Sequence, residues 1–159
     1  LAGAPRDNHP AAARRSVDEI AAAALFLGVR VALENIPGPL ATPAALAALV
    51  EDGLDARSVG LCLDFGHANL MEGVADAIET MGGLLAATHV HDNHGARDEH
   101  LPPGEGTIDW PAAVTGLRKV GYDGLLMIEC AAGGAPTGPL LERARRACAR
   151  LDEEARSGS

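Results

Sequence analysis

Four short apolar segments of this chain each end in an acidic or imidazole side chain. The residues at these ends are Glu34 in VRVALEN, Asp64 in VGLCLDFGH, His91 in ATHVHDN and Glu129 in LLMIEC. They follow one another at intervals of 30, 27 and 38 residues, and a helical pattern of apolar residues occupies each interval. This alternation predicts a series of βα units, and therefore an α/β fold with a parallel sheet.

The carboxyl ends of parallel strands meet at one edge of a sheet, so we expect these four side chains to gather there. A single carboxylate at a strand end is usually a helix cap or a surface charge. Several carboxylates together repel one another unless a cation or protons lie among them. Carboxylate oxygens and an imidazole nitrogen suit a divalent cation such as Mn²⁺, Mg²⁺, Co²⁺ or Zn²⁺. We therefore predict a metal site formed by Glu34, Asp64, His91 and Glu129.

Cap residues and apolar periodicity locate the expected elements. The pattern S-V-D-E predicts that the first helix begins at Ser16, after a polar loop, and Thr42-Pro43 predicts the start of a second helix. Further helices are expected at 74–81, 110–120 and 140–154. Strands are expected at 29–34, 58–64, 84–92 and 124–129. Residues 155–159 are polar, and we expect a disordered tail there.

The length of 159 residues fits one domain, and we expect residues 1–159 to form it. Four βα units, however, make only half of a (β/α)₈ TIM barrel, whose usual length is about 250 residues. An isolated half would expose the edges of its sheet. We therefore expect a partial TIM barrel that is truncated at its N-terminus, or that pairs with another half-barrel as a hetero- or homo-oligomer.

Charge and composition limit the possible partners. The formal charge is −9, and aromatic residues make up 3% of the chain. Such a chain repels phosphate backbones and offers few rings for stacking on bases, so a neutral or carbonyl-bearing small molecule is the better substrate and nucleic acid is disfavoured. The cysteines form no C-x-x-C pair, and no apolar run approaches the length of a membrane span. We expect a cytoplasmic protein that does not enter a membrane.

Two further histidines lie close to the predicted ligands. His67 follows Asp64 by three positions in the turn that leaves a strand, where it could contact substrate, bind a further metal or simply cap the next helix. His89 and His91 are two apart on a strand and therefore point to the same side of the sheet. We choose His91 as the ligand because it is nearer the end of the strand, and we expect His89 to form hydrogen bonds one layer deeper.

Residues 93–108, here called the long loop, have no apolar period and are rich in Gly, Pro, Asp and His. Long loops in compact domains are often functional, although a solvated turn would have a similar composition. Asp98 and His100 of this loop, together with His89, offer oxygen and nitrogen ligands for an additional metal. Arg97 offers a fork for substrate oxygens. We therefore predict that the long loop is an active-site loop.

The motifs LENIPG, LDFGHAN, HVHDN followed by DEHLPPGEGTIDW, and MIEC resemble the second half of the xylose isomerase-like barrel superfamily. The resemblance is strongest to the sugar phosphate isomerase/epimerase group, which includes tagatose and psicose 3-epimerases, and endonuclease IV belongs to the same superfamily. It spans about Ser16 to Glu129 and implies that the strands are the last four of a TIM barrel.

This resemblance implies roles for individual residues. Glu34, Asp64, His91 and Glu129 would hold the metal, while His67 and Arg97 would contact the substrate. Glu34 and Glu129 would also transfer protons in a sugar isomerase or epimerase that works through a metal-stabilised enediolate.

Three other functions remain open. An endonuclease IV-like zinc phosphodiesterase acting on abasic DNA would use His67, Asp98 and His100 as ligands of a third metal, although the charge of −9 opposes DNA binding. A metal-dependent polyol dehydratase could use the same ligands. An inactive half-barrel that serves only for association is the non-enzymatic alternative.

Overall fold

The computed structural model describes residues 9–132, 134 and 136–157. Its strands form one four-stranded parallel sheet in the order β1-β2-β3-β4, so each strand pairs with the next along the chain. The strands are β1 (Val31–Glu34), β2 (Val59–Asp64), β3 (Leu85–Val90) and β4 (Met127–Ile128). The predicted α/β fold with a parallel sheet is confirmed.

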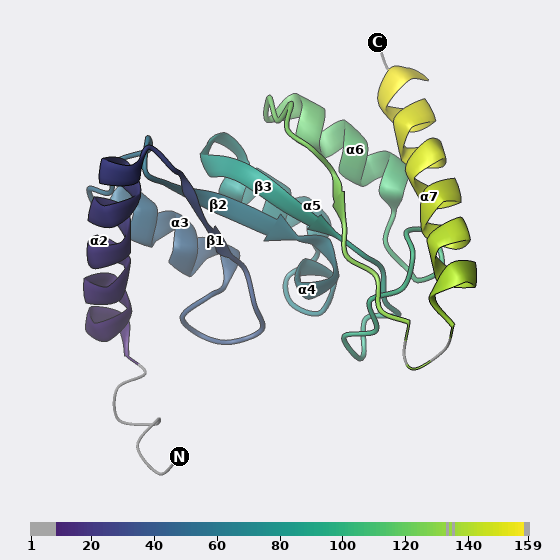
Figure 1. Cartoon of the computed structure of the whole chain (residues 1–159), viewed down its shortest axis with the longest axis horizontal. Helices are drawn as coiled ribbons and strands as arrows, with labels where there is room; N and C mark the ends of the chain where they lie inside the picture. Colours follow the sequence, from purple (N-terminus) through teal and green to yellow (C-terminus); the bar gives the residue numbers. More distant parts are fainter. Residues whose placement is uncertain (1–8, 133, 135, 158–159) are drawn as a thin grey trace.

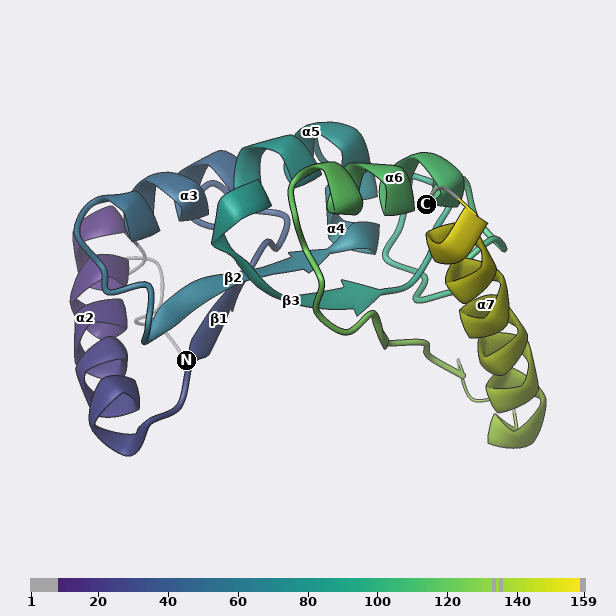
Figure 2. The ribbon, with the colours of Figure 1, turned by 90° about the horizontal axis from the view of Figure 1, so that it is seen from above.

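The helices lie mainly on one side of this sheet. They are α2 (Pro10–Leu27), α3 (Pro43–Glu51), α4 (Phe65–Asn69), α5 (Val74–Met81), α6 (Trp110–Lys119) and α7 (Thr137–Ser157), with a 3₁₀ turn η1 (Gly82–Leu84) before β3. Figure 1 shows the course of the chain, and Figure 2 shows α3, α5 and α6 along one side of the sheet, with α2 and α7 at its two ends. No described helix covers the opposite side (Figure 2).

The apolar core lies between the sheet and these helices. All six residues of β2 are buried, and Leu61 and Leu63 are completely inaccessible. They belong to one apolar cluster with Ile78 and Met81 of α5 and Leu117 of α6. The helices therefore fix the outer face of the central strands, and the strand ends are held in place by this packing.

The first helix begins earlier than the sequence pattern suggests. The helix α2 starts at Pro10, and Ser16 lies inside it, so the prediction of a start at Ser16 is wrong. Proline is favoured in the first turn, where its missing N–H is not needed, and the alanines that follow are strong helix formers. Residues 1–8 of the expected opening loop lie outside the described residues. The second start is as predicted, because Thr42 caps α3 by accepting a hydrogen bond from the Ala45 N–H at 3.2 Å.

Two C-terminal elements also differ from expectation. The last strand has only two residues, because the Leu125 carbonyl accepts hydrogen bonds from the hydroxyls of Thr88 and Tyr122 (2.9 and 3.0 Å) instead of joining the ladder. The helix α7 continues to Ser157, into the segment expected to be a disordered tail. Arg156 lies 3.9 Å from Asp152 one turn earlier, which favours continued helix. Residues 158–159 lie outside the described part of the chain.

Asp92 organises the long loop. This buried carboxylate accepts hydrogen bonds from the backbone N–H groups of Asn93 (2.9 Å), Gly104 (2.9 Å) and Ile108 (3.2 Å), and from the indole N–H of Trp110 (2.9 Å). Both ends of the loop are thereby tied to one side chain at the end of β3. The loop is irregular, as predicted, but it is held in a defined shape.

No helix in the described part of the chain combines the length and the apolar character needed to cross a membrane.

We predict that Asp92→Asn will lower the free energy of unfolding by about 2 to 3 kcal/mol, because the new amide nitrogen cannot accept from the donors that now face a carboxylate oxygen. Urea unfolding followed by circular dichroism measures the change. The exposed Asp123→Asn serves as the control and should change stability by less than about 0.5 kcal/mol. An unchanged midpoint for Asp92→Asn would contradict the central role of this carboxylate.

Candidate metal centre

Three carboxylates surround one imidazole nitrogen at the carboxyl edge of the sheet. The Nδ1 atom of His89 lies 3.4 Å from Glu34, 4.0 Å from Asp64 and 3.0 Å from Glu129. This nitrogen is buried and has no hydrogen-bond partner among the described residues. Glu34, Asp64 and His89 each offer a ligand atom within 4.8 Å of the others. The group therefore has the donor types and spacing that a divalent cation requires.

Asp64 is the most tightly held member of this group. It is fully buried at the end of β2 and caps α4 by accepting a hydrogen bond from the His67 N–H at 2.7 Å. Burial alone would raise the pKa of Asp64, but the hydrogen bonds from the His91 ring and the His67 backbone outweigh it. The pKa therefore lies below its ordinary value, and the carboxylate stays ionised at neutral pH.

Asn35 fixes the backbone at this point, a role that the sequence did not indicate. Its side chain donates to the Asp64 carbonyl (3.0 Å) and accepts from the Asp64 N–H (2.7 Å). The backbone carbonyl oxygen of Asn35 lies 2.9 Å from Nδ1 of His67. Asn35 is completely buried and directly follows Glu34, so it joins the ends of β1 and β2. The only sequence signal for this role is that Asn35 is polar and directly follows the predicted ligand Glu34.

The two histidines of the HVH motif lie in different surroundings. His89 contacts Glu34, Asp64 and Glu129, whereas the carboxylates near His91 are Asp64 and Asp98. The reason is that β3 ends at Val90, so His91 is no longer bound by the alternation of the strand. His89, which is expected one layer deeper, is therefore the histidine that contacts both Glu34 and Glu129.

A second cluster adjoins the first. It contains His67, His91, Asp98 and His100, each with a potential ligand atom within 4.8 Å of the others. Nε2 of His67 lies 3.4 Å from Asp98, and Nε2 of His100 lies 3.1 Å from the same carboxylate. The structure thus brings His67 together with Asp98 and His100, the loop residues predicted to offer ligands for an additional metal. His91 joins this cluster, whereas His89 lies with Glu34 and Asp64.

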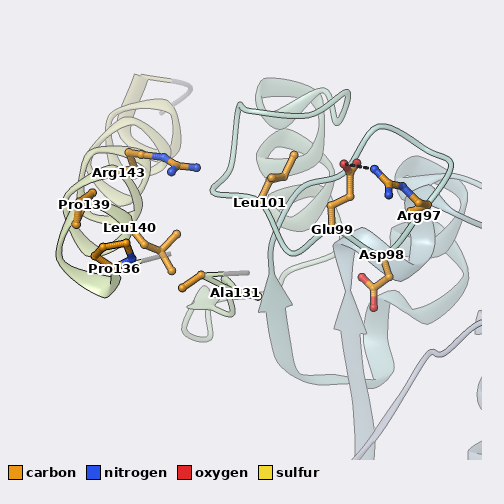
Figure 3. A pocket seen from close by; sticks show the side chains of 10 residues that line it. Arg97, Asp98, Glu99, Leu101, Ala131, Pro136, Pro139, Leu140 and Arg143 are labelled. Carbon is orange, nitrogen blue, oxygen red and sulfur yellow. Dashed lines mark ion pairs between the residues drawn. The ribbon is translucent and has the colours of Figure 1, made fainter. Parts of the chain in front are cut away.

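Arg97 lies apart from these clusters, in the wall of a neighbouring cavity of about 470 Å³. Its guanidinium is 3.6 Å from Glu99 and its side chain is 82% exposed, so it can reorient toward a ligand. Figure 3 shows Leu101 and Glu99 on one side of this cavity and Leu140 and Arg143 of α7 on the other. Asp98 belongs both to this cavity and to the second cluster, so the cavity opens next to the candidate metal centre.

Cys62 lies on β2, two residues before Asp64, and is buried. Burial and the nearby carboxylates of Glu34, Asp64 and Glu129 raise its pKa to about 12. Burial likewise raises the pKa of Cys130 to about 11. Both thiols are therefore protonated at neutral pH and are poor nucleophiles.

Comparison with known proteins gives concordant matches. A family model described as "Xylose isomerase-like TIM barrel" matches residues 1–154. An uncharacterised protein of Methanocaldococcus jannaschii is 36% identical over 121 residues, covering 72% of this chain and 41% of the relative. The 3-dehydro-D-guloside 4-epimerase of Escherichia coli is 34% identical over 76 residues, covering 47% of this chain and 27% of the enzyme.

The fold has counterparts among solved structures. The crystal structure of a D-tagatose 3-epimerase-like protein superposes with a TM-score of 0.73 at 30% identity, covering 89% of this chain and 52% of that protein. The chain thus spans about half the length of this structure and less than half of the curated relatives that it matches.

We predict that Cys62 in the folded protein will resist alkylation by iodoacetamide at pH 8. A pKa of about 12 in place of 9.0 leaves about a thousandfold less thiolate. Peptide mass spectrometry after timed labelling measures the rate, and the same protein in urea provides the control in which Cys62 should react fully. Labelling of Cys62 in the folded protein at the rate found in urea would contradict the proposed environment.

Proposed function

Because this chain belongs to the xylose isomerase-like TIM barrel family, we propose that it supplies the metal-binding part of a sugar isomerase or epimerase active site. The observation that carries this proposal is the buried Nδ1 of His89, which has no hydrogen-bond partner among the described residues and faces three carboxylates at 3.0 to 4.0 Å. Without a cation, these carboxylates would repel one another. The substrate class is inferred from the relatives whose names state an epimerase activity.

The ligand set would be Glu34, Asp64, Glu129 and one histidine. His91 is the histidine predicted from the sequence for this position, but the contacts of His89 with both glutamates favour His89. When bound, a divalent cation would supply a Lewis acid next to the substrate's carbonyl group. The same donor set suits Mn²⁺, Mg²⁺, Co²⁺ and Zn²⁺, so it does not select one of these ions.

The two glutamates are placed for proton transfer. Glu34 ends β1 and Glu129 follows β4, so they approach His89 from the two edges of the sheet. One carboxylate would remove the proton from the carbon next to the carbonyl, and for an epimerase the other would return a proton on the opposite face. Asp64, held by Asn35 and His67, would remain a fixed ligand. Arg97, with its exposed guanidinium, would bind substrate oxygens from the adjoining cavity.

We propose further that this sheet is one half of a TIM barrel. The strands β1 and β4 are the two edges of the sheet. Large apolar side chains are exposed next to both edges: Phe26, Leu27 and Val29 before β1, and Leu125 and Met127 at β4. Parallel sheets are normally covered on both faces, so a complementary set of βα units would bury these residues and complete the pocket.

The second cluster supports one alternative function, a zinc phosphodiesterase of the endonuclease IV type. Its residues His67, Asp98 and His100 lie together, as a further metal site would require. The formal charge of −9 weighs against binding of a DNA backbone. The number of metal ions bound per chain separates the two proposals, since the phosphodiesterase would fill the second cluster as well.

We predict that the purified chain binds one divalent ion per molecule and that His89→Gln weakens this binding at least 100-fold, because a ligand is lost. Titration of Mn²⁺ and Zn²⁺ in competition with a chromogenic chelator measures both affinity and number. The matched control is His94→Gln, since His94 pairs with Glu99 at 2.8 Å and is not part of either cluster. Equal affinities for the two variants would reject the assignment of His89, and no binding by the unaltered chain would reject the metal centre.

We predict that Glu129→Gln, in a barrel completed by four further βα units, lowers the exchange of the substrate's carbon-bound proton with solvent by a factor of about 100 or more. An amide cannot accept the proton, and general bases typically contribute about 10² to 10⁴ in rate. Loss of deuterium from labelled ketoses, followed by NMR, measures the exchange. The exposed Glu72→Gln is the control, and undiminished exchange in Glu129→Gln would exclude this residue as the base.

A further inference from the structure

We propose that Asn93 is a positioning residue that ties the long loop to α4 and thereby fixes Arg97 and Asp98 relative to that helix. The consequence for catalysis rests on the proposed function. The contacts of Asn93, in contrast, do not depend on a metal, so they can be tested separately.

The side chain of Asn93 uses both ends of its amide and is completely buried. Its Nδ2 donates a hydrogen bond to the backbone carbonyl of Gly66 in α4 at 2.8 Å. Its Oδ1 accepts from Nδ2 of Asn69, the last residue of α4, and from the N–H of Gly95 in the long loop, both at 2.9 Å. A carboxylate at this position would lose the donor, and an apolar side chain would lose every one of these bonds.

The backbone of Asn93 holds the other end of the long loop. Its carbonyl accepts hydrogen bonds from the N–H of Thr107 at 2.9 Å and from the Thr107 hydroxyl at 3.1 Å. The same hydroxyl accepts from Nδ2 of Asn69 at 3.2 Å. A Cβ atom added at Gly106 would lie only 2.3 Å from the Asn93 carbonyl oxygen, so a glycine there lets the two ends of the loop meet. The beginning of the loop, its end and the end of α4 therefore converge on Asn93.

Between these two ends, the loop carries side chains that face the proposed active site. Asp98 lies 3.4 Å from Nε2 of His67, which belongs to α4, and Arg97 lines the adjoining cavity. A shift of the loop relative to α4 would separate Asp98 from His67 and move Arg97 along the cavity wall. Active sites are sensitive to such shifts, because a misplacement of about 1 Å can lower a rate about 100-fold. Asn93 would thus act through these residues and not by contact with the substrate.

The substitution Asn93→Asp tests the link to α4, because it places an oxygen opposite the Gly66 carbonyl. In the metal-free chain, we expect the amides of Gly95 and Thr107 to exchange with deuterium about 5- to 100-fold faster, the effect of losing one buried hydrogen bond. NMR measures exchange at each amide. The amides of Leu61 in β2 should exchange at an unchanged rate, whereas a general loss of stability would accelerate them as well.

A nuclear Overhauser effect between histidine rings measures the separation directly. The ring centroids of His67 on α4 and His100 in the long loop are 6.4 Å apart. We expect the effect between their ring protons to be lost in Asn93→Asp. The rings of His67 and His91 have centroids 5.8 Å apart, and neither belongs to the loop. The effect between this second pair should be unchanged and serves as the internal control.

A milder substitution, Thr107→Val, removes only the hydroxyl that bonds the Asn93 carbonyl. We expect exchange at the Thr107 position to accelerate about 2- to 10-fold, as for one hydrogen bond between neutral groups. The matched control is Thr115→Val, because the exposed Thr115 hydroxyl bonds only the Pro111 carbonyl of its own helix at 2.8 Å. It should leave exchange in the loop unchanged. If Asn93→Asp does not fold, Thr107→Val decides by the same two measurements.

Unchanged exchange at Gly95 and Thr107, or an unchanged effect between His67 and His100, would overturn the inference. Equal acceleration in β2 and in the loop would overturn it as well, because Asn93 would then serve only the stability of the whole fold. The proposed function fails in a different way. An unaltered chain that binds no Mn²⁺ would reject the metal centre, whereas the exchange and ring measurements need no metal and would still decide the role of Asn93.

Discussion

The structure depends on one electrostatic constraint: acidic side chains from neighbouring parallel strands are brought to the same edge of a sheet. A parallel arrangement leaves no choice about this, because all its strands end on the same side. Asp64 is fully buried there and the Glu34 side chain is 27% exposed, so solvent cannot completely screen the repulsion between them, whereas Glu129 is exposed. Histidines occupy the space between the carboxylates, and His89 lies next to all three.

Rigid local structure maintains this unfavourable arrangement. Asn35 bonds the backbone of Asp64 on one side, and α4 begins directly after it, so Asp64 also satisfies an N–H group of the first helical turn. Asp92 performs a similar task one strand later by tying down the long loop. In both places a buried carboxylate accepts hydrogen bonds from backbone N–H groups and contacts a ring nitrogen, which is how a protein stabilises charge away from water.

The sequence predicted the parts of this structure that repeat. The order of the strands and of every helix except the short α4, the parallel sheet, the Thr42 cap of α3 and the irregular long loop all follow from local patterns of apolar, cap and turn residues. The predicted start of α2 at Ser16 is wrong because the pattern S-V-D-E, which is typical of a helix N-terminus, also occurs inside helices, as it does here. The predicted strand 124–129 is longer than β4 because hydroxyls of Thr88 and Tyr122 bind the Leu125 carbonyl. The contact with Thr88 is long-range, so the segment itself does not encode it.

The choice between His89 and His91 shows where pattern rules end. Residues two apart on a strand point to the same face of the sheet. By that rule, the histidine nearer the end of the strand should lie at the carboxyl edge of the sheet. The strand stops at Val90, however, and the chain turns toward Asp92, whose hydrogen bonds set the direction of the loop. The alternation therefore applies to His89 and not to His91, which turns to Asp64 and His100 instead. The same H-x-H spacing thus serves two neighbouring clusters, because the backbone changes direction between its two histidines.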